Sequence, residues 1–291
     1  MATILTLVAD RTATTLSAAV IQRVYDAVQG RALDILSDGE AADISCLNPP
    51  DERLIEAALE RLPIDAIVTK SRGRRKAVLV ADMDSTIVTG ETLDELAAFA
   101  GLGEQIAAIT KRSMNGELDF AQALRERVGM LKGLNISALE ETWKGVQLTP
   151  GARELVGTMR AHNATTALVS GGFTFFTGRV AELVGFDVHR ANTLIDDGEA
   201  LTGQTGQPIL DRYSKLEILR ELAAARGVQM AATLAVGDGA NDLDMIREAG
   251  LGVAFHAKQI VAREAKARVE HGNLRALLFA QGYRASEFTG A

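Results

Sequence analysis

The sequence contains a single cysteine, Cys46, among its 291 residues. A lone thiol cannot form an intramolecular disulfide, which favours a reducing compartment. No run approaches about 18 uninterrupted apolar residues, so the sequence predicts no transmembrane helix. The first ten residues lack a basic segment and already include Asp10, which argues against a secretory signal. From these absences we expect a cytoplasmic protein. Cys46 itself lies in a strand-like run over 44–47, which predicts a small buried residue rather than a nucleophile.

The chain also lacks an excess of positive charge. Lysine and arginine number 31 against 38 aspartates and glutamates, which gives a formal net charge of −7. This balance argues against nucleic acid or an anionic membrane surface as a partner. The exception is the basic run over 70–76, for which a nucleic-acid patch and a solvated linker are the alternatives. No aromatic residue interleaves the run, so we interpret residues 71–76 as a linker.

The first 70 residues are predicted to form a separate small domain. The dipeptide Asp38-Gly39 favours a tight turn between two strands. The expected elements are a strand over 3–9, a helix over 12–29, strands over 32–36 and 42–47, a helix over 51–61 and a strand over 64–69. The order βαββαβ resembles the ferredoxin-like arrangement of ACT domains, which hosts many functions.

From residue 77 onward, expected strands alternate with expected helices, which indicates an α/β domain over 77–291 with a Rossmann-like parallel sheet. The alternation is interrupted at approximately 91–148, where helical patterns follow one another without a strand. These helices are expected over 91–100, 104–115, 120–131 and 137–144. The sequence therefore predicts an all-helical insertion at this point of the domain. Three glycines within 191–211 indicate a β-hairpin flap.

Asp82 and Asp84 follow the short apolar run 78–80, which is typical of a buried strand. Open parallel sheets carry their chemistry just beyond the carboxyl ends of the strands. Two acids separated by one residue point to the same side, so they can share a cation, or one can attack while the other transfers a proton. Taken alone, an Asp-x-Asp pair is more often a polar strand end or half of a turn.

Three later segments repeat this pattern of polar residues beside an expected element. The strand-like run 165–169 leads into Ser170-Gly171-Gly172, and 233–236 leads into the segment Gly237–Asp242. Lys215 lies near the start of an expected helix over 214–226. Glycine allows a backbone to approach a phosphate closely, and amides at a helix start bind anions. Each segment alone also fits an ordinary loop, turn or surface lysine.

In this order, the four segments resemble the motifs of the haloacid dehalogenase superfamily of aspartate-nucleophile phosphatases, over roughly 76–281. Within that superfamily the chain is similar to the phosphoserine phosphatases. The resemblance implies that Asp82 is the nucleophile and Asp84 the general acid and base. It also implies a Mg²⁺ ion held by Asp82, Asp238 and the backbone carbonyl of Asp84, with Asp242 as an acceptor beside the metal.

The resemblance implies that the helical insertion over approximately 91–148 is a cap, which closes over the site and selects the substrate. Arg127 follows Phe120 and Leu124 at helical spacing, so a cation lies in line with an apolar stripe. It either snorkels beside the core or pairs with a carboxylate. The resemblance matches Arg127 to a ligand of the substrate carboxylate and Glu91, at the start of a helix, to a ligand of its ammonium. The residues expected to bind substrate are Glu91, Met114, Phe120, Arg127, Ser170, Gly171, Gly172, Lys215 and Asn241.

The resemblance, taken with these patterns, implies a Mg²⁺-dependent phosphoserine phosphatase. It would hydrolyse O-phospho-L-serine through an aspartyl-phosphate intermediate, as the final step of serine biosynthesis. One alternative is a phosphatase or phosphotransferase of the same superfamily that acts on another small phosphomonoester. The other alternative is an amino-acid-sensing regulatory protein, with residues 1–70 as the sensor. The patterns leave open whether the chain is a monomer or a homodimer, and whether residues 1–70 bind serine.

Overall fold

The computed structural model describes residues 2–115 and 117–290, apart from the side chain of Met114. The N-terminal elements form an antiparallel sheet of order β2-β3-β1-β4 with two helices. The elements are β1 (Thr3–Ala9), α1 (Ala18–Ala27), β2 (Ala32–Ser37), β3 (Ala41–Cys46), α2 (Glu52–Leu59) and β4 (Ile64–Lys70). The expected order βαββαβ is confirmed. Gly39, in the predicted turn, has φ +67°, a conformation that glycine adopts without strain.

The first helix begins later than its sequence pattern suggests. Helix α1 starts at Ala18, whereas periodicity placed its start near Thr12. Ser17 ends the preceding extended segment, and its hydroxyl accepts a hydrogen bond from the backbone N–H of Val20. Upstream, the carboxylate of Asp10 accepts hydrogen bonds from the amide and hydroxyl of Thr12 and holds a turn. Capping by short polar side chains therefore outweighs the apolar spacing at this end.

The second unit is built on a six-stranded parallel sheet of order β12-β11-β10-β5-β6-β7. Its strands are β5 (Val78–Ala81), β6 (Thr165–Phe173), β7 (Val188–Asn192), β10 (Thr233–Gly237), β11 (Leu251–Phe255) and β12 (Ala267–Val269). Its helices are α7 (Ala152–Ala161), α8 (Thr174–Val184), α9 (Arg212–Ala225), α10 (Leu243–Glu248), α11 (Gln259–Glu264) and α12 (Arg275–Ala280). Alternate residues of β5 enter two different apolar clusters, Leu79 and Ala81 one and Val78 and Val80 the other. Both faces of the sheet are thus covered, as a parallel sheet requires.

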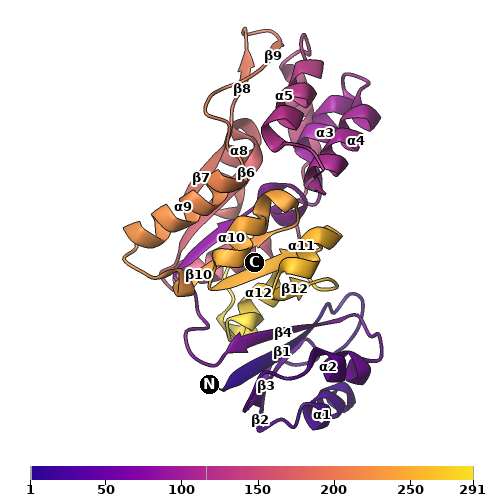
Figure 1. Cartoon of the computed structure of the whole chain (residues 1–291), viewed down its shortest axis with the longest axis vertical. Coiled ribbons are helices and arrows are strands. Elements are labelled where there is room, and N and C mark those ends of the chain that lie inside the picture. The colour runs from indigo at the N-terminus through magenta and orange to yellow at the C-terminus, as the bar shows by residue number, and fades with distance from the viewer. Residues whose placement is uncertain (1, 116, 291) are drawn as a thin grey trace.

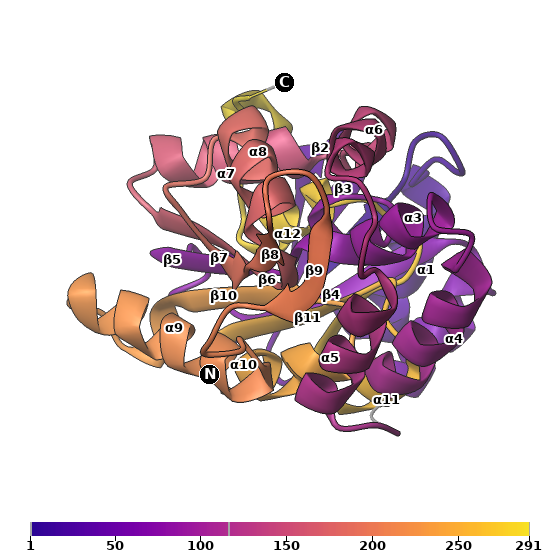
Figure 2. The same ribbon diagram turned by 90° about the horizontal axis from the view of Figure 1, so that it is seen from above.

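Four helices interrupt this unit after β5 and form a cap above one end of the sheet (Figure 1). They are α3 (Thr92–Ala98), α4 (Gly103–Met114), α5 (Phe120–Met130) and α6 (Ser137–Gly145). The predicted flap is the hairpin of β8 (Leu194–Asp196) and β9 (Leu201–Thr205), which lies beside α5 (Figure 2). The hairpin holds the cap through backbone hydrogen bonds, from Gly133 to Leu201, from Leu201 to Leu134 and from Ile136 to Glu199. Among the described residues, no helix has the length and apolar content needed to cross a lipid bilayer.

The N-terminal sheet lies at the far end of the molecule from the cap (Figure 1). One face packs on α1 and α2 through a cluster that includes Leu7 and Ile44. Its other face contributes Val8, Ala41 and Ile67 to the same apolar cluster as the parallel sheet. The two units therefore share a core, whatever the exact boundary between them.

The expected linker takes part in this junction. The guanidinium of Arg74 donates from Nη2 to Asp43 Oδ1 at 3.0 Å and to the carbonyl of Phe279, in α12, at 3.1 Å. Thr6 also donates its hydroxyl to Asp43 at 2.7 Å. The side chains of Arg74 and Asp43 are 12% and 8% exposed. The run over 71–76 is thus not simply a solvated spacer, because Arg74 connects the N-terminal sheet to the end of the chain.

Replacing Arg74 with methionine should destabilise the folded protein by about 3–5 kcal/mol, because Asp43 would stay buried without its cation. Urea unfolding followed by circular dichroism measures the change. Arg72→Met is the matched control, since Arg72 is exposed in the same segment, and it should shift the free energy of unfolding by less than about 0.5 kcal/mol. Equal effects of the two substitutions would contradict a buried junction at Arg74.

Candidate active site

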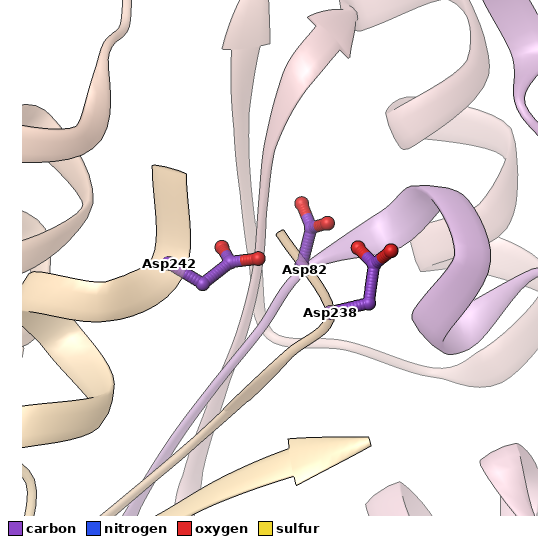
Figure 3. Close-up of side chains that lie close together, drawn as sticks. All are labelled: Asp82, Asp238 and Asp242. Atoms are coloured by element: carbon purple, nitrogen blue, oxygen red, sulfur yellow. The ribbon is translucent and has the colours of Figure 1, made fainter. Parts of the chain in front are cut away.

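The acidic residues predicted from sequence meet at the carboxyl ends of two neighbouring strands. Asp82 follows β5 and Asp238 follows β10, and these strands are paired in register, with Ala81 opposite Val236. Asp242 comes from the turn after β10. One oxygen from each of Asp82, Asp238 and Asp242 lies within 4.8 Å of the others, and all three residues are buried (Figure 3). Parallel pairing therefore brings together carboxylates that are far apart in the sequence.

Lys215 lies among these carboxylates and bridges two of them. Its Nζ is 2.6 Å from Asp82 Oδ1 and 2.6 Å from Asp242 Oδ1, and the side chain is 1% exposed. Helix α9 presents Lys215 in its first turn, where Asp211 caps the helix. Burial lowers the pKa of the Lys215 ammonium, but Asp242 and Asp82 outweigh this effect and hold it above its ordinary value. Lys215 is therefore a permanently charged bridge.

Asp238 differs from its neighbours in lacking hydrogen-bond partners. Within the described residues, neither of its buried carboxylate oxygens accepts a hydrogen bond. The ammonium of Lys258 approaches Oδ2 at 3.4 Å. Burial and the charge of Asp242 raise the pKa of Asp238 to about 7. An unsatisfied buried carboxylate beside a second one fits a cation, because hard divalent cations bind carboxylate oxygens.

Asp242, by contrast, already has partners. Its Oδ1 binds Lys215, and its Oδ2 accepts the backbone N–H of Gly239 at 3.1 Å. A Cβ on Gly237 would lie 2.3 Å from Cγ of Asp242, so the strand end must be glycine for this carboxylate to fit. Asp242 thus fixes Lys215 and the Gly-Asp-Gly turn, which is compatible with its expected role beside a metal rather than as a main ligand.

Asp84 faces the same space from the turn Met83–Ile87. Its Oδ1 accepts the backbone N–H of Thr92 at 2.8 Å, and its Oδ2 accepts the hydroxyl of Ser170 at 3.3 Å. Burial raises the pKa of Asp84, against the effect of these hydrogen bonds. Burial and Asp242 likewise raise the pKa of Asp82 well above its usual range, and Lys215 opposes the rise. A raised pKa suits Asp84 to holding a proton that it can transfer.

The Ser-Gly-Gly segment differs from its predicted form. We expected the strand to end at residue 169, but β6 continues to Phe173, and α8 starts directly after it at Thr174. The register with β7 is irregular between Val169 and Phe173. Asn192, which sequence reasoning missed, donates its amide to the carbonyl of Gly171 at 2.9 Å. This side-chain bond replaces part of the strand pairing, and apolar patterning gives no signal for it.

The cap and the core enclose a small cavity of about 50 Å³. It is lined by the predicted residues Asp82, Asp84, Glu91, Phe120, Arg127, Ser170, Gly171, Gly172 and Asn241, and also by Leu93, Thr110, Ser113 and Leu124. The side chain of Met114 lies outside the described residues. Phe120 approaches the core so closely that a Cβ on Gly171 would lie 2.6 Å from its ring. Contact between cap and core therefore explains the glycine at position 171.

Thr110 and Ser113 are lining residues that sequence reasoning missed. Both lie on α4, on the same side as the fully buried Ile106, at spacings of four and seven residues. Small polar residues on the buried face of an amphipathic helix were the available signal. They suggest that the helix faces a polar cavity.

Two opposite charges come from the cap. Arg127 is 6% exposed, donates from Nε to the carbonyl of Ala123 at 3.2 Å, and donates from Nη1 to the hydroxyl of Thr110 at 2.9 Å. Within the described residues, no carboxylate lies at ion-pair distance from its guanidinium. Glu91 accepts the hydroxyl of Ser85 at 2.6 Å, and burial followed by the charge of Asp84 raises its pKa well above the usual range. Neither charge is neutralised by a direct ion pair.

The geometry defines a phosphoryl-transfer type of site on a parallel α/β sheet, and comparison with known proteins agrees. The chain belongs to the haloacid dehalogenase-like hydrolases, whose family model matches residues 76–250. It is 42% identical to a phosphoserine phosphatase of Archaeoglobus fulgidus, over 74% of this chain and 63% of that one. It is 40% identical to the phosphoserine phosphatase of Methanocaldococcus jannaschii, over 70% of this chain and 97% of that one.

A solved structure also resembles nearly the whole chain, including its N-terminal unit. This structure, of a probable phosphoserine phosphatase from Vibrio cholerae, matches with a TM-score of 0.77 and 33% identity. The match covers 98% of this chain and 88% of the Vibrio chain. The chain spans between 53% and 63% of the length of three curated phosphoserine phosphatases that it resembles.

Asp238→Asn should stabilise the metal-free protein by about 1 kcal/mol or more, because it removes a buried charge that lacks hydrogen bonds. It should also abolish the rise in melting temperature that Mg²⁺ or Mn²⁺ gives the unaltered protein. Thermal unfolding in chelator and in added cation measures both effects. Glu248→Gln, exposed in the following helix, is the control and should keep the metal response. An unchanged metal response in Asp238→Asn would exclude Asp238 as a ligand.

Proposed function

We propose that the protein is a Mg²⁺-dependent phosphatase that hydrolyses O-phospho-L-serine to L-serine and phosphate. The observation that carries this proposal is the charge pattern of one cavity, which pairs Asp82 and Asp84 on its floor with Arg127 and Glu91 on its cap. The first pair suits phosphoryl transfer, and the second matches the carboxylate and ammonium of an amino acid. The similarity to phosphoserine phosphatases supports the same substrate.

The reaction would proceed in two steps. Asp82 attacks phosphorus, the bond from phosphorus to the serine oxygen breaks, and Asp84 gives its proton to the leaving alkoxide. Asp84 then takes a proton from a water molecule, which attacks the aspartyl phosphate, releases phosphate and restores Asp82. The raised pKa of Asp84, caused by burial, suits the first proton transfer.

The other residues of the floor bind the phosphate and offset charge. Lys215 fixes one oxygen of Asp82 and supplies a positive charge beside the phosphoryl group. Ser170, Gly171, Gly172 and Asn241 line the same cavity, so phosphate oxygens would lie beside them. The hydroxyl of Ser170 donates to Asp84 and accepts the amide of Gly172, so a bound phosphate would share or replace these hydrogen bonds. Asp82, Asp238 and the backbone carbonyl of Asp84 would hold Mg²⁺, which when bound stabilises the negative charge of the phosphoryl oxygens.

The rival activities fit the cavity less well. A sugar phosphate carries neither a carboxylate nor an ammonium, so it would leave Arg127 and Glu91 buried without partners. A purely regulatory protein would not need the buried set of Asp82, Lys215 and Asp238. The cytoplasmic location, the place in serine biosynthesis and a homodimeric state stay predictions.

Asp82→Asn should lower kcat by at least about 10³-fold, because an amide oxygen is a poor nucleophile. The acid-stable phosphate label that a phosphoserine pulse should leave on the unaltered protein should disappear. Rapid-quench labelling and phosphate release measure the two effects, and circular dichroism checks the fold. Turnover near the unaltered level in a folded variant would exclude covalent catalysis by Asp82.

Arg127→Ala should lower kcat/KM for phosphoserine by about 30- to 4,000-fold, because a buried contact to the substrate carboxylate is lost. Phosphoethanolamine lacks only that carboxylate, so its slower turnover should change less than about 3-fold. Arg125→Ala, exposed on the same helix, is the control and should affect neither substrate. Equal losses on both substrates in Arg127→Ala would remove phosphoserine as the assigned substrate.

A further inference from the structure

Three cap helices each contribute one residue to a chain of hydrogen bonds that ends at Arg127. Asp94 comes from α3, Thr110 from α4 and Arg127 from α5. Thr110 donates its hydroxyl proton to Asp94 Oδ1 at 2.6 Å, and Arg127 Nη1 donates to the oxygen of Thr110 at 2.9 Å. Thr110 is 4% exposed, so water has little access to this chain.

The direction of these hydrogen bonds is fixed by chemistry. A guanidinium can only donate, and a hydroxyl has one proton and two lone pairs. Because the carboxylate of Asp94 takes the proton of Thr110, the lone pairs of Thr110 turn toward Arg127. Asp94 therefore orients the hydroxyl that holds the guanidinium, and it does so without touching Arg127.

Asp94 reaches Arg127 only through Thr110, and this arrangement leaves N–H groups of the guanidinium free of Asp94. Asp94 supplies a negative charge near Arg127, which offsets part of the cost of burying the guanidinium. A direct bidentate pair with Asp94 would use the fork of N–H groups that a substrate carboxylate needs. In the described residues this fork makes only two hydrogen bonds, to Ala123 and Thr110, although a guanidinium has five N–H donors.

The hydrogen bond to Thr110 also bears on the contact between Arg127 and Glu91, the acid that the cap contributes to the cavity. Glu91 lines the cavity with Arg127, and unlike charges in a buried space attract strongly. Glu91 is instead held by the hydroxyl of Ser85, at 2.6 Å. With a hydroxyl bound to each, Arg127 and Glu91 make no direct ion pair in the described residues, and both side chains line the cavity where a ligand would lie.

We propose that Thr110 and Asp94 are positioning residues for substrate selection, which hold Arg127 for a substrate carboxylate through the Asp94–Thr110–Arg127 chain. This inference rests on the proposed function, since it concerns how that site recognises a phosphorylated amino acid. It predicts that loss of the Thr110 hydroxyl weakens recognition of the carboxylate and leaves phosphoryl transfer intact.

Thr110→Val, which keeps the shape of the side chain, should lower kcat/KM for phosphoserine by about 10- to 100-fold, mainly through a higher KM. Phosphoethanolamine should change less than about 3-fold. Thr110→Ser should restore phosphoserine turnover to within about 3-fold, because the hydroxyl returns. The kcat/KM of Asp94→Asn for phosphoserine should lie between those of Thr110→Val and Thr110→Ser. Glu126→Gln removes one negative charge from the exposed side of α5 and should behave like the unaltered protein.

A double variant tests whether Thr110 acts through Arg127. In Arg127→Ala, a further Thr110→Val change should cause no more than about a 3-fold loss, because the group that it positions is already absent. Multiplied losses, equal losses on both substrates in Thr110→Val, or no rescue by Thr110→Ser would each overturn the inference. If Thr110→Val does not fold, Asp94→Asn and Thr110→Ser give the same comparison.

The rates of phosphoserine and phosphoethanolamine hydrolysis by the unaltered protein distinguish a failure of this inference from a failure of the proposed function. If the unaltered protein hydrolyses phosphoethanolamine as fast as phosphoserine, the proposed substrate fails before any variant is measured. If the unaltered protein prefers phosphoserine but Thr110→Val keeps that preference, only the positioning role fails.

Discussion

The rest of the site depends on the buried contact of Lys215 with Asp82 and Asp242. Five carboxylates, of Asp82, Asp84, Glu91, Asp238 and Asp242, gather in or beside the cavity, and the cations near them in the described residues include Lys215, Arg127 and Lys258. Repulsion among buried acids on this scale favours their protonated forms. Lys215 opposes the rise in the pKa of Asp82 and holds one of its carboxylate oxygens at 2.6 Å. A divalent cation and a substrate ammonium would supply the positive charge that this cavity still lacks.

The residues proposed for phosphoryl transfer and those proposed for substrate selection come from different parts of the fold. The acids of the floor lie where β5 and β10 end, and their positions are set by parallel pairing inside a rigid core. Arg127, Phe120 and Glu91 come instead from cap elements. Under the proposed function, substitutions of cap residues would change which phosphorylated alcohol is accepted and leave the acids at the strand ends in place. The hairpin β8–β9, bonded to the loop between α5 and α6, ties the cap to the core outside the cavity.

The alternation of apolar runs was sufficient to predict the sheet, whereas the site residues could be predicted only from the four motifs taken together, because each motif alone also fits an ordinary strand end or turn. Asp82, Ser170 and Asp238 each follow a short apolar run, and that pattern correctly placed them together. Contacts between helices of the cap leave no such signal. Thr110 reads as one polar residue of an amphipathic helix, and only the packing of α4 against α5 places it at Arg127. The predicted start of the first helix was also wrong, because the side chain of Ser17 caps the helix at Ala18 although the apolar spacing continues before it.

The N-terminal unit has no residue among those that line the cavity, so any influence on the reaction must pass through the core. In the described residues, one series of contacts leads from the N-terminal unit to Asp238. Asp65, buried at the start of β4, accepts backbone N–H groups of Glu270, His271 and Gly272. The carbonyl of Gly272 contacts the ring of His256, two residues before Lys258, which approaches Asp238. These contacts run from the N-terminal unit past the carboxyl ends of β12 and β11 to Asp238, but contact alone is not coupling. A ligand of the N-terminal unit would alter catalysis only if it favoured one of two arrangements of this loop.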